Sequence, residues 1–284
     1  MTSIAVMGHN FPYNVMKRKV TTADFLASHP VFSLDEAAAA LEPPGGRSGT
    51  VERLKHYLET GRLLLAAREV YAVVPPGLSA ATFAFNPFLV AAACRPDGIF
   101  AYHSALELLG VAHSAWNRCT LYTGRKRRSI HLGTTNVVFL DPPGPLRGKN
   151  CLHVGTRLLE RSGRMLRVTG PERTLIESLR RPALSGGLEE VLNSASAFPV
   201  LDLGLLLKIL GLFGSSGLST AVGWFLERFR ETYHVPDKAL RQIERRRPRS
   251  PRYMERGQRG GVLLTRWNLI VPRQVASMEE PDER

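Results

Sequence analysis

The spacing of apolar residues predicts two helices near the start of the chain. Ser33 and Glu36 have the Ser-x-x-Glu spacing of a capping box, and an alanine-rich run follows them. The segment Pro43-Pro44-Gly45-Gly46 contains residues that end helices and form turns. Beyond it, apolar positions at i, i+3 and i+7 predict a second helix over residues 48–60 with one inward stripe, formed by Val51, Leu54 and Leu58.

Residues 63–65 and 70–74 are rich in strand-forming side chains, and residues 66–69 between them predict a tight turn. A short amphipathic helix over residues 21–28 comes before the first capping box. Three helices followed by a two-stranded ribbon is the element order of a winged helix-turn-helix, in which the second helix of the motif enters the major groove of DNA.

On this hypothesis the residues that contact DNA lie on the outward face of the second helix and on the wing. With Leu54 inward, Glu52 and His56 fall on the opposite face. The amino end of the helix carries free backbone N–H groups that suit a phosphate. The candidate DNA contacts are Arg47, Ser48, Arg53, Lys55 and His56 from the helix, and Arg62 and Arg68 from the wing.

The remaining pattern predicts a mixed α/β middle and a helical end. We expect a helix over 86–95 and a helix over 104–109 with Ser104 and Glu107 as its capping pair. Strands are expected over 119–123, 129–132, 136–140, 151–159 and 165–169. Helices are expected over 171–179, 187–194, 201–212, 218–232 and 237–246, and a strand over 267–271.

The fold class is therefore α/β, of the α+β type, with a winged helix-turn-helix at its start. We expect residues 1–18 to be a disordered extension and 19–77 to be the winged DNA-binding domain. Residues 78–273 would form one C-terminal α+β domain, because the few short strands need helices to cover them. Residues 274–284 would be a disordered tail.

Composition adds a strong positive charge to this picture. The 284 residues carry 38 Lys and Arg against 25 Asp and Glu, a net charge of +13, and the pI is about 10.2. A pI above roughly 9 is typical of nucleic-acid-binding proteins. The three cysteines are widely spaced, so we expect reduced thiols and a cytoplasmic protein. No apolar run reaches the roughly 18 residues of a membrane span.

Two basic runs leave two interpretations open. Arg125, Lys126, Arg127 and Arg128 would form either a solvated hairpin tip or additional phosphate contacts. A second run continues through Arg245, Arg246, Arg247, Arg249, Arg252, Arg256 and Arg259, and it would meet solvent, phosphate or an acidic partner protein.

Motifs for catalysis or for metal binding are missing from the sequence. It contains neither a phosphate-binding glycine-rich loop nor a metal-ligand or nucleophile-elbow pattern. Tyr102-His103-Ser104 with Glu107 is better explained by helix capping than by an active site. We therefore expect a protein that is not an enzyme and that needs no cofactor or metal.

Several stretches, in their order along residues 21–273, resemble the AbiEi-type antitoxins. These are VYAVVPPG, AYHSALELLGV, VTGPERTLIESLRRP followed by two glycines, AVGWFLER and RWNLIVP. The chain departs from that family at Pro43-Pro44-Gly45-Gly46-Arg47, where we expect a longer turn before the second helix.

This resemblance implies an antitoxin of a two-gene toxin–antitoxin system. The winged module would bind the promoter of its own operon as double-stranded DNA and repress it. The C-terminal domain would counteract a nucleotidyltransferase-like toxin without a stable complex. The alternative hypothesis is a protein-interaction module, in which the winged helix is only a scaffold and an acidic partner protein is bound.

Overall fold

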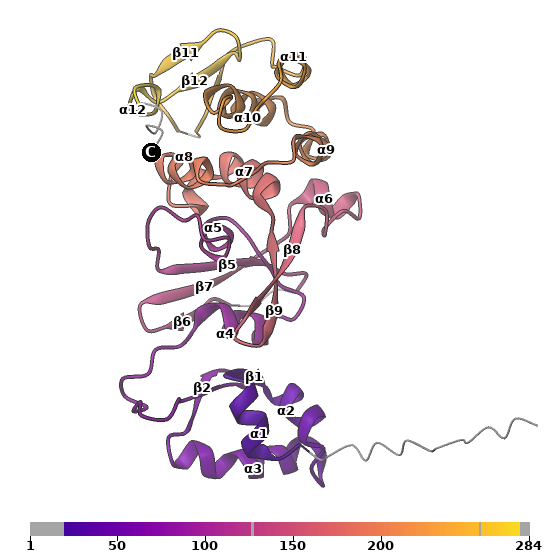
Figure 1. The fold of residues 1–284 in the computed structure, drawn as a ribbon, viewed down its shortest axis with the longest axis vertical. Coiled ribbons are helices and arrows are strands. Elements are labelled where there is room, and N and C mark those ends of the chain that lie inside the picture. Colours follow the sequence, from indigo (N-terminus) through magenta and orange to yellow (C-terminus); the bar gives the residue numbers. More distant parts are fainter. Residues whose placement is uncertain (1–19, 126–127, 256, 279–284) are drawn as a thin grey trace, which may run out of the picture.

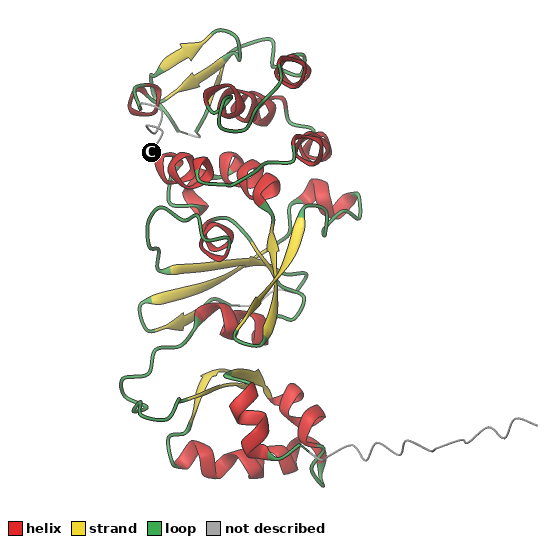
Figure 2. Ribbon diagram, viewed as in Figure 1, coloured by secondary structure: helices red, strands yellow, loops and turns green. Residues whose placement is uncertain are grey.

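The computed structural model describes residues 20–125, 128–255 and 257–278. Figure 1 shows three parts stacked along the long axis: a winged module, a central sheet with its helices, and a helical end that carries a small second sheet. The α+β class predicted from the sequence is confirmed (Figure 2).

The winged module contains three helices and three strands. Its sheet is antiparallel, in the order β1-β3-β2. The predicted two-stranded ribbon therefore gains a third strand, β1, which lies just before the helix that begins with the capping box. That strand has only three residues, too few for a recognisable alternation. The elements are α1 (Thr22–Ser28), β1 (Val31–Ser33), α2 (Leu34–Leu41), α3 (Gly46–Glu59), β2 (Leu63–Ala67) and β3 (Val70–Val73).

The predicted caps of the winged module are present. The Thr21 side chain accepts a hydrogen bond from the Asp24 amide at the start of α1. At α2 the capping box is complete, because the Ser33 hydroxyl accepts from the Glu36 amide and the Glu36 carboxylate accepts from the Ser33 amide.

The turn between α2 and α3 is shorter than we expected. It spans residues 42–45, a length that is ordinary for a helix-turn-helix. Gly45 has a φ of +82°, in the left-handed region that glycine adopts without strain. A Cβ on Gly49 would lie 2.0 Å from the carbonyl oxygen of Pro44, so the turn packs directly on the first turn of α3.

The inward stripe of α3 is partly different from the prediction. Thr50 and Leu54 are fully buried, and Leu58 packs beside the core. Val51 is 41% exposed, so its predicted inward position is wrong. The helix begins two residues earlier than expected, and Thr50, whose hydroxyl donates to the Gly46 carbonyl, takes the buried place instead.

The central part is a six-stranded mixed sheet in the order β6-β7-β5-β4-β9-β8. β5 pairs with β7 in parallel, whereas β6–β7, β4–β5 and β8–β9 are antiparallel. Its strands are β4 (Ile99–Phe100), β5 (Arg118–Tyr122), β6 (Ile130–Leu132), β7 (Thr135–Leu140), β8 (Thr156–Arg161) and β9 (Arg164–Thr169). Three short helices accompany it: α4 (Pro87–Cys94), α5 (His103–Leu108) and α6 (Gly144–Gly148).

Two element starts predicted for this central part are wrong. The strand expected from residue 151 begins only at Thr156, because residues 151–155 form turns. Ser104 does not cap α5, which begins one residue earlier without a side-chain cap. Ser104 is buried instead, and its hydroxyl accepts a hydrogen bond of 2.7 Å from the Thr120 amide of β5.

Helix α4 packs against two parts of the molecule, the winged sheet and the central sheet. All of its residues from Phe88 to Cys94 are buried. They belong to one apolar cluster with Val31 and Val70 of the winged sheet and with Leu121 of the central sheet. The sheet side of the winged module is therefore covered by α4, and α3 lies on the far side, facing away from the rest of the protein (Figure 1).

The helical end follows the predicted order of five segments. A large apolar cluster joins them and includes Leu106 of α5 and Leu146 of α6. The helices are α7 (Pro171–Arg180), the 3-10 turn η1 (Pro182–Leu184), α8 (Leu188–Ser196), α9 (Leu203–Phe213), α10 (Ser216–Arg228) and α11 (Asp237–Glu244).

A small sheet in the order β10-β12-β11 closes the chain, and a short helix follows it. Val275 in that helix is buried, so the expected disordered tail does not begin at residue 274. Residues 279–284, and the expected extension up to residue 18, lie outside the described residues. The elements are β10 (Arg252–Tyr253), β11 (Val262–Leu264), β12 (Leu269–Val271) and α12 (Arg273–Ala276).

The three cysteine thiols have different surroundings. Cys94 and Cys119 are buried and Cys151 is half-buried. Burial raises the pKa of the Cys119 thiol well above its ordinary value. In the described part of the chain, no helix is both long and apolar enough to cross a membrane.

Candidate nucleic-acid interface

The outward face of α3 presents most of the predicted DNA contacts. Ser48, Lys55 and His56 are exposed there, and Arg53 is half-buried beside them. Glu52 is also exposed, as the helical period predicted. Neither Arg53 nor Lys55 takes part in an ion pair with the described residues, so both are available to a ligand.

The amino end of α3 also meets solvent. Its N-cap is Gly45, and no side chain caps the helix. The first N–H groups of the helix therefore keep a partial positive charge that suits a phosphate oxygen. Arg47 and Ser48, which were predicted to contact DNA, lie near that end, and the arginine is already engaged within the module.

Arg47 joins three elements of the winged module. Its guanidinium forms ion pairs with Asp35 of α2 and, at 2.8 Å, with Glu69 in the β2–β3 turn. The carbonyl of Glu69 also accepts a hydrogen bond of 2.8 Å from the Leu34 amide. The wing turn is therefore held against the two helices, and Arg47 would have to leave two carboxylates to contact DNA.

Arg62 and Arg68, both predicted at the wing, lie at opposite ends of β2. That strand has five residues, which separates them by roughly 17–20 Å in an extended chain. Arg62 is exposed beside α3, with its guanidinium 5.8 Å from the Tyr57 ring. The structure therefore adds Arg62 to the α3 face and places Arg68 elsewhere.

Arg68 shares a cavity of about 480 Å³ with Arg125, where the winged module meets the central part. The cavity also contains Asp35 and Asp97. Burial opposes the charge on Asp97, but hydrogen bonds from the Thr123 hydroxyl and the Gly124 amide hold the pKa of its carboxyl below the ordinary value. The cavity thus contains both signs of charge.

The predicted hairpin tip over residues 125–128 is wrong in its topology. β5 and β6, on either side of the run, do not pair with each other, because β7 lies between them in the sheet. In the strand order β7 therefore lies between the two strands that the run connects. Arg125 and Arg128 are exposed, whereas Lys126 and Arg127 lie outside the described residues.

The positive charge of the chain is not concentrated on the winged module. Residues 20–77 contain five Arg and Lys against seven Asp and Glu, a net charge of −2, whereas the whole chain carries +13. The net charge of the module therefore does not add to the prediction of DNA binding, which rests on its element order. Phosphate attraction at α3 must come from a few side chains rather than from a basic domain.

An ion pair helps to fix the winged module in place. Arg164, in β9, contacts the Glu36 carboxylate at 2.9 Å and donates a hydrogen bond of 3.1 Å to the Val31 carbonyl. Burial opposes the charge on Glu36, but the hydrogen bond from Arg164 and those at Ser33 hold its pKa below the ordinary value. Together with α4, this pair fixes the direction in which α3 points.

The polar residues around His103, discussed above as a helix cap, lie at a buried contact between α5 and α8. His103 is 1% exposed, and its Nε2 lies 3.5 Å from the Glu190 carboxylate of α8. Burial lowers the pKa of this imidazole despite the nearby carboxylates. Glu190 also accepts hydrogen bonds from the Ser114 hydroxyl and the His113 amide. These bonds join the loop before β5 to α8.

A second buried network was not predicted. Glu177 of α7 accepts hydrogen bonds from Arg173 at 2.8 Å and from the Tyr122 hydroxyl at 3.0 Å, and the arginine and the glutamate are fully buried. Burial raises the pKa of Glu177 despite the neighbouring guanidinium. The Glu-Arg-Thr-Leu sequence that contains Arg173 therefore joins the helical end to the sheet.

Comparison with known proteins supports the fold. The crystal structure of the RV2827C protein from Mycobacterium tuberculosis is similar, with a TM-score of 0.54 at 18% sequence identity. The match covers 85% of this chain and 86% of that one. No protein-family model matches, and no curated protein matches by sequence. At this identity the similarity concerns the overall fold alone.

No group of three or more His, Cys, Asp or Glu side chains among the described residues is placed to hold a metal ion.

Proposed function

We propose that this chain is a DNA-binding regulator that represses its own operon, with α3 as the helix that enters the major groove. The observation that carries the proposal is the placement of α3. The winged sheet is buried on α4, and the face with Lys55 and His56 is turned outward. A helix-turn-helix placed in this way can approach a duplex without moving any other part of the protein.

The contacts on α3 divide into two kinds. Arg53 and Lys55 are long enough to reach base edges or phosphates, and the uncapped amino end at Ser48 suits a phosphate. Glu52 on the same face would accept a hydrogen bond from a cytosine amino group and repel phosphate elsewhere. A face with so few cations predicts modest affinity and a specificity that depends on base contacts.

The resemblance to AbiEi-type antitoxins extends the proposal to a toxin–antitoxin operon. The helical end and the central sheet would then counteract a nucleotidyltransferase-like toxin. The similarity in fold to the RV2827C protein supports the common architecture of the chain and nothing finer. The toxin would be sought in the neighbouring reading frame.

The test uses the full chain, because a fragment that ends at residue 77 would expose the apolar face that α4 covers. We would measure binding to the duplex upstream of the gene, with unrelated duplex as competitor, at several salt concentrations. Arg53→Ala is compared with Lys208→Ala, which removes one exposed charge from α9, far from α3.

We expect Arg53→Ala to weaken binding to the upstream duplex by roughly 10- to 100-fold, as the loss of a base contact does. Lys208→Ala should change it by less than about twofold. Equal effects of the two variants, or equal affinity for upstream and unrelated duplex, would contradict specific recognition by α3.

The second candidate function is a protein-interaction module, and the net charge of −2 on residues 20–77 favours it. In that case the winged module would be only a scaffold, and a basic surface elsewhere in the chain would bind an acidic partner protein. The same experiment separates the two, because a scaffold shows no preference for the upstream duplex at any salt concentration.

A further inference from the structure

The last turn of α11 and the arginine-rich run after it line a hollow. Helix α11 lies at the end of the molecule opposite α3 (Figure 1). The hollow has a volume of about 670 Å³, within the range of ligand-binding sites. It is lined by Arg241, Glu244, Arg245, Arg247, Pro248, Arg249 and Asn268. Residues 241–249 contain five arginines and one glutamate, so this short segment carries a net charge of +4.

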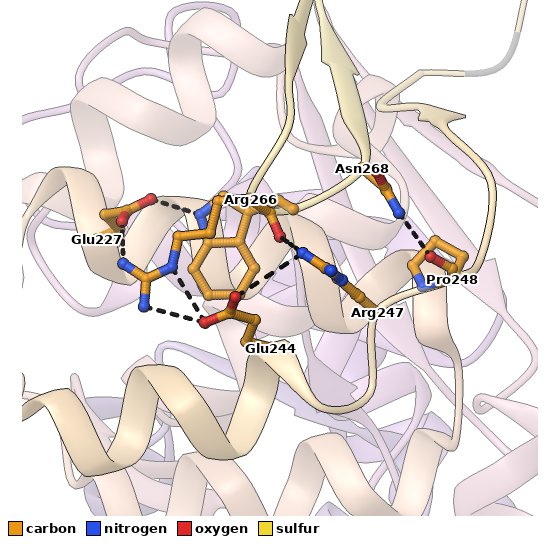
Figure 3. Close-up of polar contacts among 7 residues, drawn as sticks. Glu227, Glu244, Arg247, Pro248, Arg266 and Asn268 are labelled. Atoms are coloured by element: carbon orange, nitrogen blue, oxygen red, sulfur yellow. Dashed lines mark hydrogen bonds and ion pairs between the residues drawn. The ribbon is translucent and has the colours of Figure 1, made fainter.

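The single carboxylate in the lining is already engaged. Glu244 accepts two hydrogen bonds of 3.2 Å from Arg266, which also contacts Glu227 of α10 (Figure 3). The Arg266 side chain lies over the Trp267 ring, with 5.2 Å between guanidinium and ring centroid. Glu244 thus has two cationic partners, Arg266 and, at 3.8 Å, Arg247. The lining contains no second carboxylate to balance its other arginines.

The segment that carries the arginines is held in one shape. Arg247 donates a hydrogen bond of 2.8 Å to the Arg266 carbonyl, and the Asn268 side-chain amide donates one of 2.9 Å to the Pro248 carbonyl (Figure 3). Pro248 is buried between two exposed arginines. These contacts join residues 247–248 to the turn before β12, so the arginines project from a fixed backbone.

Three of the arginines remain available. Arg241, Arg245 and Arg249 are exposed, and none of them forms an ion pair with the described residues. Keeping several guanidinium groups close together raises the energy of the empty site, because like charges repel. A ligand with clustered negative charge relieves that repulsion, and arginine binds phosphate oxygens through two parallel hydrogen bonds.

We propose that this hollow is a second ligand site, separate from α3, that binds the phosphate groups of a nucleotide or of a single nucleic-acid strand. A concave site fits a protruding phosphate chain better than the broad surface of an acidic protein. An ordinary solvated charge run would lie on a convex surface and would not be fastened at Arg247 and Pro248. The site explains where a large part of the +13 charge is used.

The test measures binding of three probes to the full chain: inorganic triphosphate, ATP and a 12-nucleotide single-stranded RNA. Single-stranded RNA offers no B-form major groove to α3. The double variant Arg245→Gln/Arg249→Gln is compared with Arg181→Gln/Lys208→Gln, which removes the same charge from exposed positions outside the hollow. All the substituted side chains are exposed, and equal melting temperatures would verify that the fold is kept.

We expect the hollow variant to weaken binding of at least one probe by roughly 10-fold or more, and the control variant by less than about twofold. A preference for ATP and triphosphate identifies a nucleotide site, and a preference for RNA identifies a strand site. Equal losses in the two variants, or binding of none of the probes, would overturn the proposal.

The upstream-duplex experiment on the same variants keeps this site distinct from α3. The hollow variant should retain its preference for upstream over unrelated duplex. Loss of that preference together with phosphate binding would contradict a separate site.

Discussion

The winged module and the arginine hollow differ both in architecture and in net charge. The module has the element order of a DNA-binding protein but a net charge of −2 over residues 20–77. The hollow carries +4 over residues 241–249 but belongs to no familiar DNA-binding motif. A basic pI is therefore a property of the whole chain, and it does not reveal which surface meets a nucleic acid.

The two surfaces also suit different parts of recognition. Contacts with phosphates supply affinity that depends on salt, whereas contacts with base edges supply specificity. α3 is rigidly placed and sparsely charged, which favours specificity. The hollow is densely charged and concave, which favours affinity for any exposed phosphate. Three predictions test this division, beginning with the largest effect.

Substitution of one glycine by alanine in each region gives a comparable packing defect in both. A Cβ on Gly223 of α10 would lie 2.2 Å from the Trp267 ring, and one on Gly49 would lie 2.0 Å from the Pro44 carbonyl oxygen. We expect each change to alanine to destabilise its region by roughly 1–3 kcal/mol, as overpacking does. Thermal unfolding with hydrogen exchange would locate the damage.

The functional consequences should separate. Gly49→Ala should reduce the preference for the upstream duplex and leave phosphate binding at the hollow intact. Gly223→Ala should weaken phosphate binding at the hollow and leave the preference for the upstream duplex intact. Gly217→Ala in α10 is the control, because nothing lies within 4 Å of the added Cβ. It should be neutral or stabilising by up to about 1 kcal/mol. Identical effects of the first two changes would mean that the regions are not independent.

A substitution of Arg47 tests whether this residue contacts DNA or stays paired within the winged module. Its pairs with Asp35 and Glu69 are exposed, so we expect Arg47→Ala to cost less than about 1 kcal/mol of stability. Since both pairs would be lost on contact with phosphate, its effect on duplex affinity should be smaller than that of Arg53→Ala. A larger loss of affinity would show that Arg47 leaves its partners to bind DNA.

The smallest expected effect is the loss of stability at low pH that depends on Glu36. The pKa of the folded Glu36 carboxyl lies below its ordinary value of 4.5, so its contribution to stability is present above that value and is lost as the pH falls through the lower one. The protection factors of the β1 amides, which correct for the intrinsic slowing of exchange in acid, should therefore fall below about pH 4.5. In Arg164→Ala this extra pH dependence should shrink, and an unchanged dependence would exclude the pair as its cause.

Local patterns predicted most of the helices and strands because their signals are short-range. The capping box at Ser33 and the glycine-rich turn before α3 are examples, since each is decided within a few residues. Patterns failed where distant segments decide the outcome. Neither the burial of Thr50 in place of Val51 nor the position of β7 between β5 and β6 follows from neighbouring residues.

The candidate sites show the same limit. The exposed face of α3 follows from the helical period, so Lys55 and His56 were predicted correctly as exposed. That Arg47 is already paired depends on Glu69, 22 positions away in the sequence. The arginine run is obvious in the sequence, but its shape as a hollow depends on the contact between Pro248 and Asn268. Charge can be counted along a chain, whereas concavity needs the fold.

The different burial of the three cysteines has a practical consequence. Cys94 and Cys119 are shielded, and the raised pKa of Cys119 further disfavours its reactive thiolate. Half-buried Cys151, in the turns between α6 and β8, is then the thiol that a maleimide dye reaches first. A single fluorophore attached there would label the protein between the two ends of the molecule without occupying either surface.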